Sequence, residues 1–186
     1  MKMDSLADVK PEDIMLQYGP TKILLDKYVW HSPNAGIIAS YSPKARDVKD
    51  HFGIFRGVDQ IESFTQASGS CSVFLECKKL GLNPAELKNK FVPRFISIGQ
   101  VHFHYFLEEG DTYINIGHIK FYKFRQMVSD GRIYKVPKGL DLDHYFNNYT
   151  EKQLLEYDLS EDFILVAELF DITARAIKTD LLNKIR

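Results

Sequence analysis

The chain has 186 residues, of which 45% are hydrophobic, 26% charged and 13% aromatic, a balance typical of one globular domain that can bury its own core. The formal net charge is −1, so a nucleic-acid-binding function, which usually comes with a strong basic excess, is not expected. The first ten residues lack the apolar run of a signal peptide and no stretch approaches the ~20 apolar residues of a membrane span, so we expect a soluble cytoplasmic protein with no membrane partner.

The N-terminal quarter predicts a short helix, a hairpin and a loop. Residues 11–19 begin with proline and two acidic residues and end in glycine, as short helices do. Residues 21–43 hold two apolar runs on either side of Ser-Pro-Asn-Ala-Gly at 32–36, which predicts two strands joined by a turn. Residues 44–57 carry mixed charge and are expected to form a loop.

A long helix is expected over residues 58–80, ended by Gly81. Its interior, residues 65–72, is made mainly of small side chains, some of which are poor helix formers. Small side chains let a helix lie very close to another surface, so we expect this helix to be buried against a sheet. A second short helix is predicted at 84–90.

The C-terminal half predicts strands. Residues 95–136 are rich in aromatic and β-branched side chains, with turn signals at 108–111 and 129–132, and the Asp-Gly pair in the second is typical of a hairpin. Residues 137–161 are polar and are expected to be an insert with a short helix at 151–157.

A last strand is predicted at 163–177, followed by a short C-terminal tail. These elements predict an α+β fold in a single domain, residues 1–186, with one long helix wrapped by antiparallel strands.

The segment HFGIFRGVDQIESFTQASG, residues 51–69, resembles the motif H-F-P-G-x-P-x-x-P-G-V-x-x-x-E-x-x-x-Q-x-x-G of the β-hydroxyacyl-(acyl carrier protein) dehydratases. The matching positions are His51, Phe52, Gly57, Val58, Glu62, Gln66 and Gly69. Upstream, PEDIMLQYGPTKILLDKYV is similar to the family's opening EIMxxLPHRYPFLLVDRV. The likeness covers residues 11–136 and 163–177, and it implies the hotdog fold, in which a curved antiparallel sheet wraps a central helix.

Two features depart from the family pattern. The loop GIFR at 53–56 is three residues shorter than the family loop and has no proline, although prolines stiffen such a loop. The insert at 137–161 is absent from the small dehydratases.

The resemblance implies removal of water from a 3-hydroxyacyl thioester, or the reverse hydration, and the residues suit that chemistry. His51 suits the base because an imidazole is partly neutral at cellular pH. Glu62 suits the acid, and Gln66, four residues further along the helix, shares its face and can orient the carboxyl group. The backbone N–H groups at Gly57 and Val58 could stabilise charge on the thioester oxygen, because the first N–H groups of a helix lack internal partners.

The resemblance also implies a homodimer or an assembly of dimers, with His51 and Glu62 of one site supplied by two subunits. The substrate would be a thioester of acyl carrier protein or coenzyme A, and no cofactor is expected. A basic cluster of Lys44, Arg46, Lys49 and Arg56 could receive an acidic carrier protein, or could be a solvated charged loop. No metal is expected, because His102 and His104 share a strand face without a third ligand at suitable spacing.

Plainer interpretations stay open. His51 could be a loop histidine bonded to a backbone carbonyl, and Glu62 a solvated first-turn glutamate. At the level of function, the alternatives to a dehydratase are a catalytically inactive acyl-binding or partner subunit of dehydratase type, favoured by the shortened loop, and a hotdog acyl thioesterase. A thioesterase would need the carboxylate but not His51.

Overall fold

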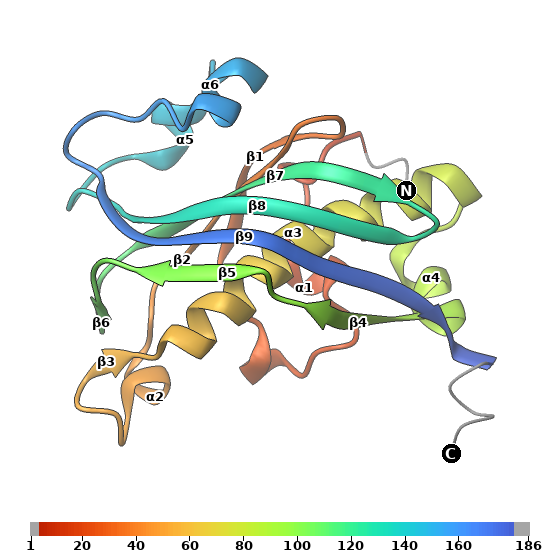
Figure 1. The fold of residues 1–186 in the computed structure, drawn as a ribbon, viewed down its shortest axis with the longest axis horizontal. Helices are drawn as coiled ribbons and strands as arrows, with labels where there is room; N and C mark the ends of the chain where they lie inside the picture. Colours follow the sequence, from red (N-terminus) through yellow and green to blue (C-terminus); the bar gives the residue numbers. More distant parts are fainter. Residues whose placement is uncertain (1–3, 181–186) are drawn as a thin grey trace.

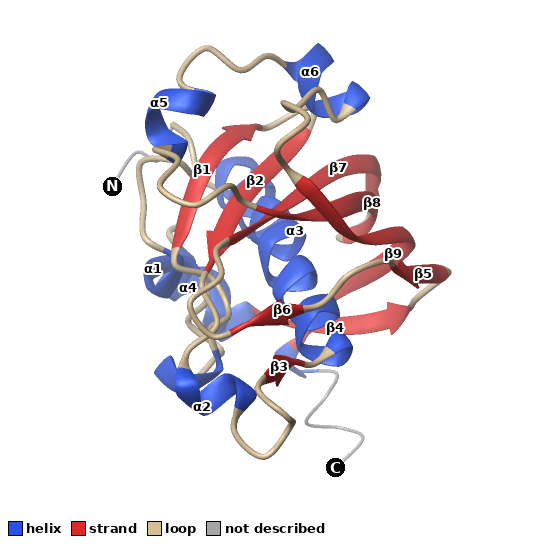
Figure 2. Ribbon diagram, turned by 90° about the vertical axis from the view of Figure 1, so that its left-hand side faces the viewer, coloured by secondary structure: helices blue, strands red, loops and turns tan. Residues whose placement is uncertain are grey.

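The computed structural model describes residues 4–180, and a single long helix, α3 (Gly57–Leu80), organises it. An antiparallel sheet curves around this helix (Figures 1 and 2), with strand order β1-β2-β7-β8-β9-β4 and with β5 also paired to β9. The strands are β1 Lys27–Ser32, β2 Gly36–Tyr41, β4 Phe91–Ser97, β5 Gln100–Phe103, β7 Tyr113–Lys123, β8 Gln126–Lys135 and β9 Ile164–Lys178. The expected α+β class, with one buried helix in a curved sheet, is confirmed.

Short elements surround this core. They are α1 Pro11–Ile14, the 3-10 helix η1 Pro20–Lys22, α2 Ala45–Val48, β3 Ile54–Phe55, α4 Pro84–Lys90, β6 Leu107–Glu108, α5 Leu142–Phe146 and α6 Glu151–Glu156. The helices predicted at 84–90 and 151–157 are confirmed to within a residue. Among the helices in residues 4–180, none is long and apolar enough to cross a membrane.

Two predictions for the N-terminal part were wrong in detail. The helix expected over 11–19 ends at Ile14, because the chain turns so that Met15 enters the core and Tyr18 packs at its edge. The loop expected over 44–57 contains α2 and the two-residue strand β3, which pairs with β6. Asp47 stabilises α2 by accepting hydrogen bonds from the backbone N–H of Lys44 at its N-terminus and from the Tyr41 hydroxyl, an interaction that the sequence pattern did not predict.

The close approach of α3 to the sheet depends on Gly131, which faces a second glycine across the ladder. Gly117 of β7 and Gly131 of β8 are direct partners across the ladder, and the buried ring of Phe64 lies against both. A Cβ atom at Gly131 would lie 2.3 Å from the Phe64 ring and 2.2 Å from the Ile116 carbonyl oxygen. Gly131 therefore needs to be glycine because the Phe64 ring occupies the space of a side chain, whereas a Cβ atom at Gly117 would make an ordinary contact of 3.4 Å with the same ring.

The hairpin turn predicted at 129–132 was wrong. Strand β8 runs straight through Asp130 and Gly131, and the turn lies at Phe124 and Arg125, whose φ angles of 54° and 61° are those of a tight two-residue hairpin. The glycine of the Asp-Gly pair serves helix packing and not chain reversal, and sequence alone does not separate these two uses.

Residues 137–161 cover the sheet face that points away from α3. Side chains alternate between the faces of a strand, so Ile37 of β2 packs toward the helix while Ile38 packs toward this outer layer. Phe146, just inside α5, and Leu154 of α6 are buried in that outer cluster. Figure 1 shows α5 and α6 together on this side of the sheet. Of the expected C-terminal tail, residues 181–186 lie outside the described residues.

His31 connects β1 to the N-terminal segment. Its Nδ1 accepts a hydrogen bond of 3.2 Å from the Leu6 backbone N–H, and its ring meets Phe74 edge-on at 4.7 Å. Burial lowers the pKa of His31 from 6.5 to about 4, because protonation would charge a desolvated ring and end its role as an acceptor.

We predict that replacing Gly131 with alanine will lower the free energy of unfolding by about 3 kcal/mol, because the new Cβ would overlap a backbone oxygen and the Phe64 ring. Urea denaturation would measure the change. Gly19→Ala is the control, since a Cβ there meets no atom within 4 Å. Equal stability of Gly131→Ala and wild type would contradict the packing role.

We also predict a pH dependence from His31. Its pKa is lower in the folded chain than in the unfolded chain, so the unfolded state takes up a proton first as pH falls. Stability is therefore complete above about pH 6.5 and declines between 6.5 and 4, by roughly 3 kcal/mol at about 1.4 kcal/mol per pKa unit. His31→Gln should reduce this decline in urea titrations at several pH values, whereas substitution of the exposed His102 should not.

Candidate functional site

A pocket of about 720 Å³ lies beside the first turns of α3. Its walls come from three segments: the turn between α1 and the hairpin, the α2–β3 loop, and the helix itself. The lining residues used below are Tyr18, Lys22, Arg46, Lys49, His51, Arg56, Asp59 and Glu62. A single chain therefore brings His51 and Glu62 to the same pocket, and the division of one site between two subunits stays a prediction.

His51 is held in a tight turn at the end of α2. The His51 N–H donates to the Val48 carbonyl, and the Ile54 N–H donates to the His51 carbonyl, at 3.2 and 2.9 Å. Asp50, Phe52 and Gly53 all have positive φ angles, so this loop without proline folds as a compact turn.

The imidazole of His51 has a defined orientation within this turn. Its Nδ1 lies 3.2 Å from the Ile54 carbonyl oxygen. A carbonyl only accepts, so Nδ1 carries the proton in the neutral ring and Nε2 keeps a free lone pair. The hydrogen bond to a backbone carbonyl, which a purely structural loop histidine would also make, leaves the ring able to act as a base.

Glu62 lies on α3 with two polar neighbours. The Gln66 side chain donates from Nε2 to Glu62 Oε1 at 3.0 Å, as expected from their spacing of four. Tyr18 is the second neighbour. Burial is the largest cause that raises the pKa of the Tyr18 phenol, and the Glu62 carboxylate is the next. Tyr18 therefore stays protonated at neutral pH and can donate to Glu62.

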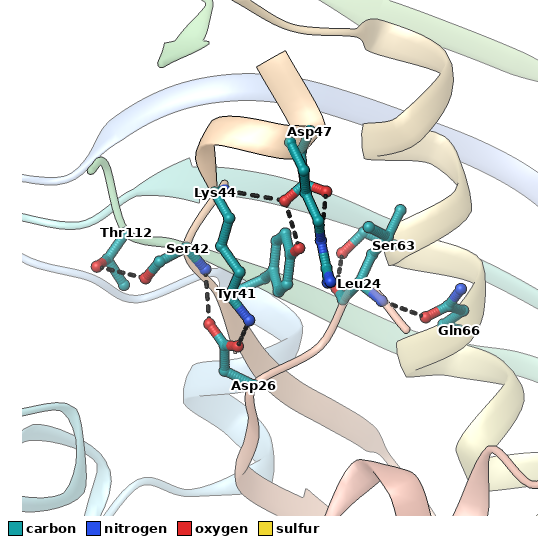
Figure 3. Close-up of polar contacts among 10 residues, drawn as sticks. Leu24, Asp26, Tyr41, Ser42, Lys44, Asp47, Ser63, Gln66 and Thr112 are labelled. Atoms are coloured by element: carbon teal, nitrogen blue, oxygen red, sulfur yellow. Dashed lines mark hydrogen bonds and ion pairs between the residues drawn. The ribbon is translucent and has the colours of Figure 1, made fainter. Parts of the chain in front are cut away.

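Gln66 is nearly fully buried and joins the helix to the segment before β1. Its Oε1 accepts from the Leu24 N–H at 2.8 Å and its Nε2 donates to the Lys22 carbonyl at 2.8 Å. Ser63 adds a hydrogen bond of 2.7 Å to the Leu24 carbonyl. Figure 3 shows Gln66 and Ser63 pointing from the helix toward Leu24. Gln66 therefore both orients Glu62 and satisfies buried backbone groups.

Gly57 and Val58 begin α3 but do not line this pocket. The ring of Phe103 covers Gly57, where a Cβ would come within 2.8 Å of it, and Val58 is 64% exposed. The Asp59 and Gln60 N–H groups both donate to the Arg56 carbonyl, whereas those of Gly57 and Val58 have no acceptor among the described residues. The N–H groups of Gly57 and Val58 therefore remain available for a ligand, as expected for the first residues of a helix.

The basic cluster is only partly directed at the pocket. Arg46, Lys49 and Arg56 line it together with Lys22, while Lys44 pairs with Asp26 at 3.2 Å. Arg56 is neutralised by Asp59, with two hydrogen bonds of 2.6 and 2.8 Å.

Two of the lining residues, Tyr18 and Lys22, were missed by the sequence analysis. They lie in an irregular segment without periodicity, so no pattern in the sequence pointed to them. Within residues 4–180, no group of three or more His, Cys, Asp and Glu side chains suits a metal ion, and His104 pairs with Glu168.

Comparison with known proteins identifies the fold. No family model and no curated protein matches the sequence. The dehydratase heterocomplex ApeI:P from Xenorhabdus doucetiae is similar in structure, with a TM-score of 0.65 over 95% of this chain and 97% of that chain at 11% identity. A hypothetical thioesterase with coenzyme A from Streptococcus pneumoniae gives 0.48 over 83% and 87% at 9% identity. The chain has the hotdog fold.

We predict that Gln66→Ala will destabilise the chain by about 3 kcal/mol, because it leaves the buried Leu24 N–H and the part-buried Lys22 carbonyl without their hydrogen-bond partner. Thermal or urea unfolding would measure the loss. Thr65→Ala is the matched control on the same helix, since the Thr65 hydroxyl bonds only to the Ile61 carbonyl one turn back. Similar losses in the two variants would argue against a special role for Gln66.

Proposed function

We propose that the protein interconverts a 3-hydroxyacyl thioester and the corresponding 2-enoyl thioester by loss or addition of water. The observation that carries the proposal is the pairing of His51 and Glu62 in one pocket, with the free Nε2 of His51 and the Gln66-oriented carboxyl of Glu62. These two residues are also the acid–base pair of the dehydratase motif that the sequence resembles.

The reaction distributes its protons between the two side chains. In dehydration, Nε2 of His51 takes the proton from C2, the electron pair forms the C2–C3 double bond, and the C3 hydroxyl leaves as water with a proton from Glu62. Charge that develops on the thioester oxygen needs hydrogen-bond donors; the resemblance assigns this role to the N–H groups of Gly57 and Val58, which precede Asp59 of the pocket wall but do not themselves line the pocket. Hydration is the same path in reverse.

The charges around the pocket fit a phosphate-bearing carrier. Lys22 and Lys49 line it without a salt bridge among the described residues, whereas Arg46 and Arg56 pair with Asp47 and Asp59, and lysine side chains bind phosphate groups. The phosphates of coenzyme A, or the phosphopantetheine arm and acidic surface of acyl carrier protein, are suitable partners for this rim.

The free edge of the sheet supports an assembly of at least two chains. Strand β4 is hydrogen-bonded on one side only, to β9, and its end and the following turn expose Phe95, Ile96 and Ile98 by 39%, 51% and 45%. An unpaired apolar edge of this kind is normally covered in native proteins. We expect a second copy, or a similar chain, to pair there.

The second candidate is a non-catalytic subunit that partners a similar chain. The observation in its favour is the short loop around His51, in which Asp50, Phe52 and Gly53 have positive φ angles and Phe52 is 96% exposed. Such a loop could serve contact with a partner in place of aiming a base.

Hydration of 2-butenoyl-CoA by the purified protein tests the proposal. The reaction is monitored by the loss of the enoyl ultraviolet absorbance. We expect turnover in the wild type and a loss of about a hundredfold or more in His51→Ala and in Glu62→Gln, because each removes a proton-transfer group. His102→Ala and Glu12→Gln, which alter exposed residues outside the pocket, should retain activity.

The pattern of results separates the candidates. Loss in Glu62→Gln without loss in His51→Ala, together with hydrolysis of the thioester, would indicate a thioesterase. Absence of turnover with short and long chains on either carrier would favour the non-catalytic subunit.

A further inference from the structure

Residues 137–161 cover the outer face of the sheet over only part of its length. Tyr157, which follows α6, reaches as far as His118 of β7, whose Nδ1 lies 3.1 Å from the Tyr157 hydroxyl. Beyond His118, β7 and β8 continue to their hairpin turn, at the end of the sheet away from α5 and α6 (Figure 1). Phe121 and Phe124 of this stretch are 45% and 72% exposed.

The side chains of this stretch lie in two rows across the outer face. Directly paired residues of neighbouring strands point to the same face of a sheet. One row consists of Lys123, Gln126, Arg175 and Arg94, from β7, β8, β9 and β4, and the row beside it consists of Phe121, Val128 and Thr173. Met127, between the two rows on β8, is buried against α3, so both rows point away from the helix. We call these two rows and Phe124 the hairpin patch.

The hairpin patch is basic and partly apolar, and none of its residues is acidic. Lys123, Arg175 and Arg94 are exposed, and within residues 4–180 none of them forms a salt bridge. The next carboxylates along β8 and β9, Asp130 and Asp171, are both paired with Lys120, at 3.1 and 2.7 Å. The patch therefore attracts negative charge, although the chain as a whole has a formal net charge of −1.

The place of the patch argues against an acidic carrier protein as its partner. The Tyr122 hydroxyl, next to the patch on β7, donates to Glu76 of α3 at 2.6 Å. Glu76 lies fourteen residues after Glu62 on the same helix, a distance of about 20 Å. A carrier docked on the patch would be this far from the candidate site and on the opposite face of the sheet from α3.

The chemistry of the patch fits an anionic lipid surface. Aromatic side chains enter the boundary between headgroups and acyl chains, and lysine and arginine bind anionic headgroups while their methylene stems stay on apolar surface. The sheet curves around α3, so its outer face is convex and its hairpin tip stands clear (Figure 2). Phe124 at that tip lies beside a cation, since Lys123 Nζ is 5.2 Å from the centre of its ring.

We propose that the hairpin patch docks the protein on an anionic lipid surface. Phe121 and Phe124 enter the headgroup layer, while Lys123, Arg175 and Arg94 contact the anionic headgroups. Peripheral binding of this kind needs no spanning segment, so it is compatible with the lack of one, from which we expected no membrane partner. The inference goes beyond the proposed reaction and does not depend on it.

Binding to vesicles tests the inference. The full chain is sedimented with vesicles of phosphatidylcholine alone and with vesicles of equal parts of phosphatidylcholine and phosphatidylglycerol. We expect the wild type to bind the anionic vesicles at least about tenfold more tightly, because each cation near an anionic surface contributes roughly fivefold. Raising the salt concentration should weaken this binding, since salt screens the cations.

Variants of the patch and of the insert identify the surface that binds. Lys123→Gln should weaken binding to the anionic vesicles about fivefold. Phe124→Asn should weaken it about tenfold by removing an inserted ring, and asparagine tolerates the positive φ angle of this turn. Lys152→Gln and Leu155→Ser make similar changes at exposed sites of α6 and should bind as the wild type does.

Several results would overturn the inference. They are equal binding to the two kinds of vesicle, binding to neither, and equal losses in the patch variants and the α6 variants. A smaller oligomeric mass of Phe124→Asn in analytical ultracentrifugation would overturn it by assigning the patch to contact between copies of the chain. Hydration of 2-butenoyl-CoA is measured without vesicles, so failure of the lipid inference and failure of the proposed reaction are read separately.

Discussion

The contact of Phe64 with the backbone of β7 and β8 is the constraint on which the remaining structure depends. Gly131 of β8 faces Gly117 of β7 across the ladder, and the missing side chain at Gly131 lets the Phe64 ring lie against the strands. A helix held this close must present small side chains to the sheet, which accounts for the buried alanine and serine residues in the interior of α3. The position and rotation of the helix, and therefore the direction in which Glu62 points, follow from that contact.

Gln66 is the point at which the fold and the candidate site meet. Its amide satisfies the Leu24 N–H and the Lys22 carbonyl, and the same nitrogen donates to Glu62. A buried side chain with three partners has little freedom, so the carboxyl group is fixed by the bonds that also hold the entry to β1 against the helix. The stability of the fold and the orientation of the Glu62 carboxyl group are therefore linked through one side chain.

The faces of α3 serve different purposes. One face, with Phe64, packs on the sheet, and another, with Glu62 and Gln66, faces the pocket and the segment before β1. A central helix in a curved sheet is well suited to this, because its two ends and its uncovered side remain open to ligands. The outer layer at 137–161 covers the opposite face of the sheet and leaves this side free.

The sequence by itself determined the class of fold, the long helix and most strands, because hydrophobic period, small residues and caps are local signals. It also identified His51, Glu62 and Gln66 as candidates, from their order and spacing in one motif. It placed a hairpin turn at Asp130-Gly131, where the structure has a straight strand, because a glycine required by a distant ring looks the same as a glycine required by a turn.

Only the tertiary structure shows which residues distant segments contribute to the pocket and to the start of α3. Tyr18 and Lys22 reach the pocket from an irregular segment, and Phe103 covers the helix start from a strand far along the chain. The tautomer of His51 was likewise fixed only by neighbours in the fold. Local sequence encodes which elements form, whereas contacts between distant segments depend on packing in three dimensions.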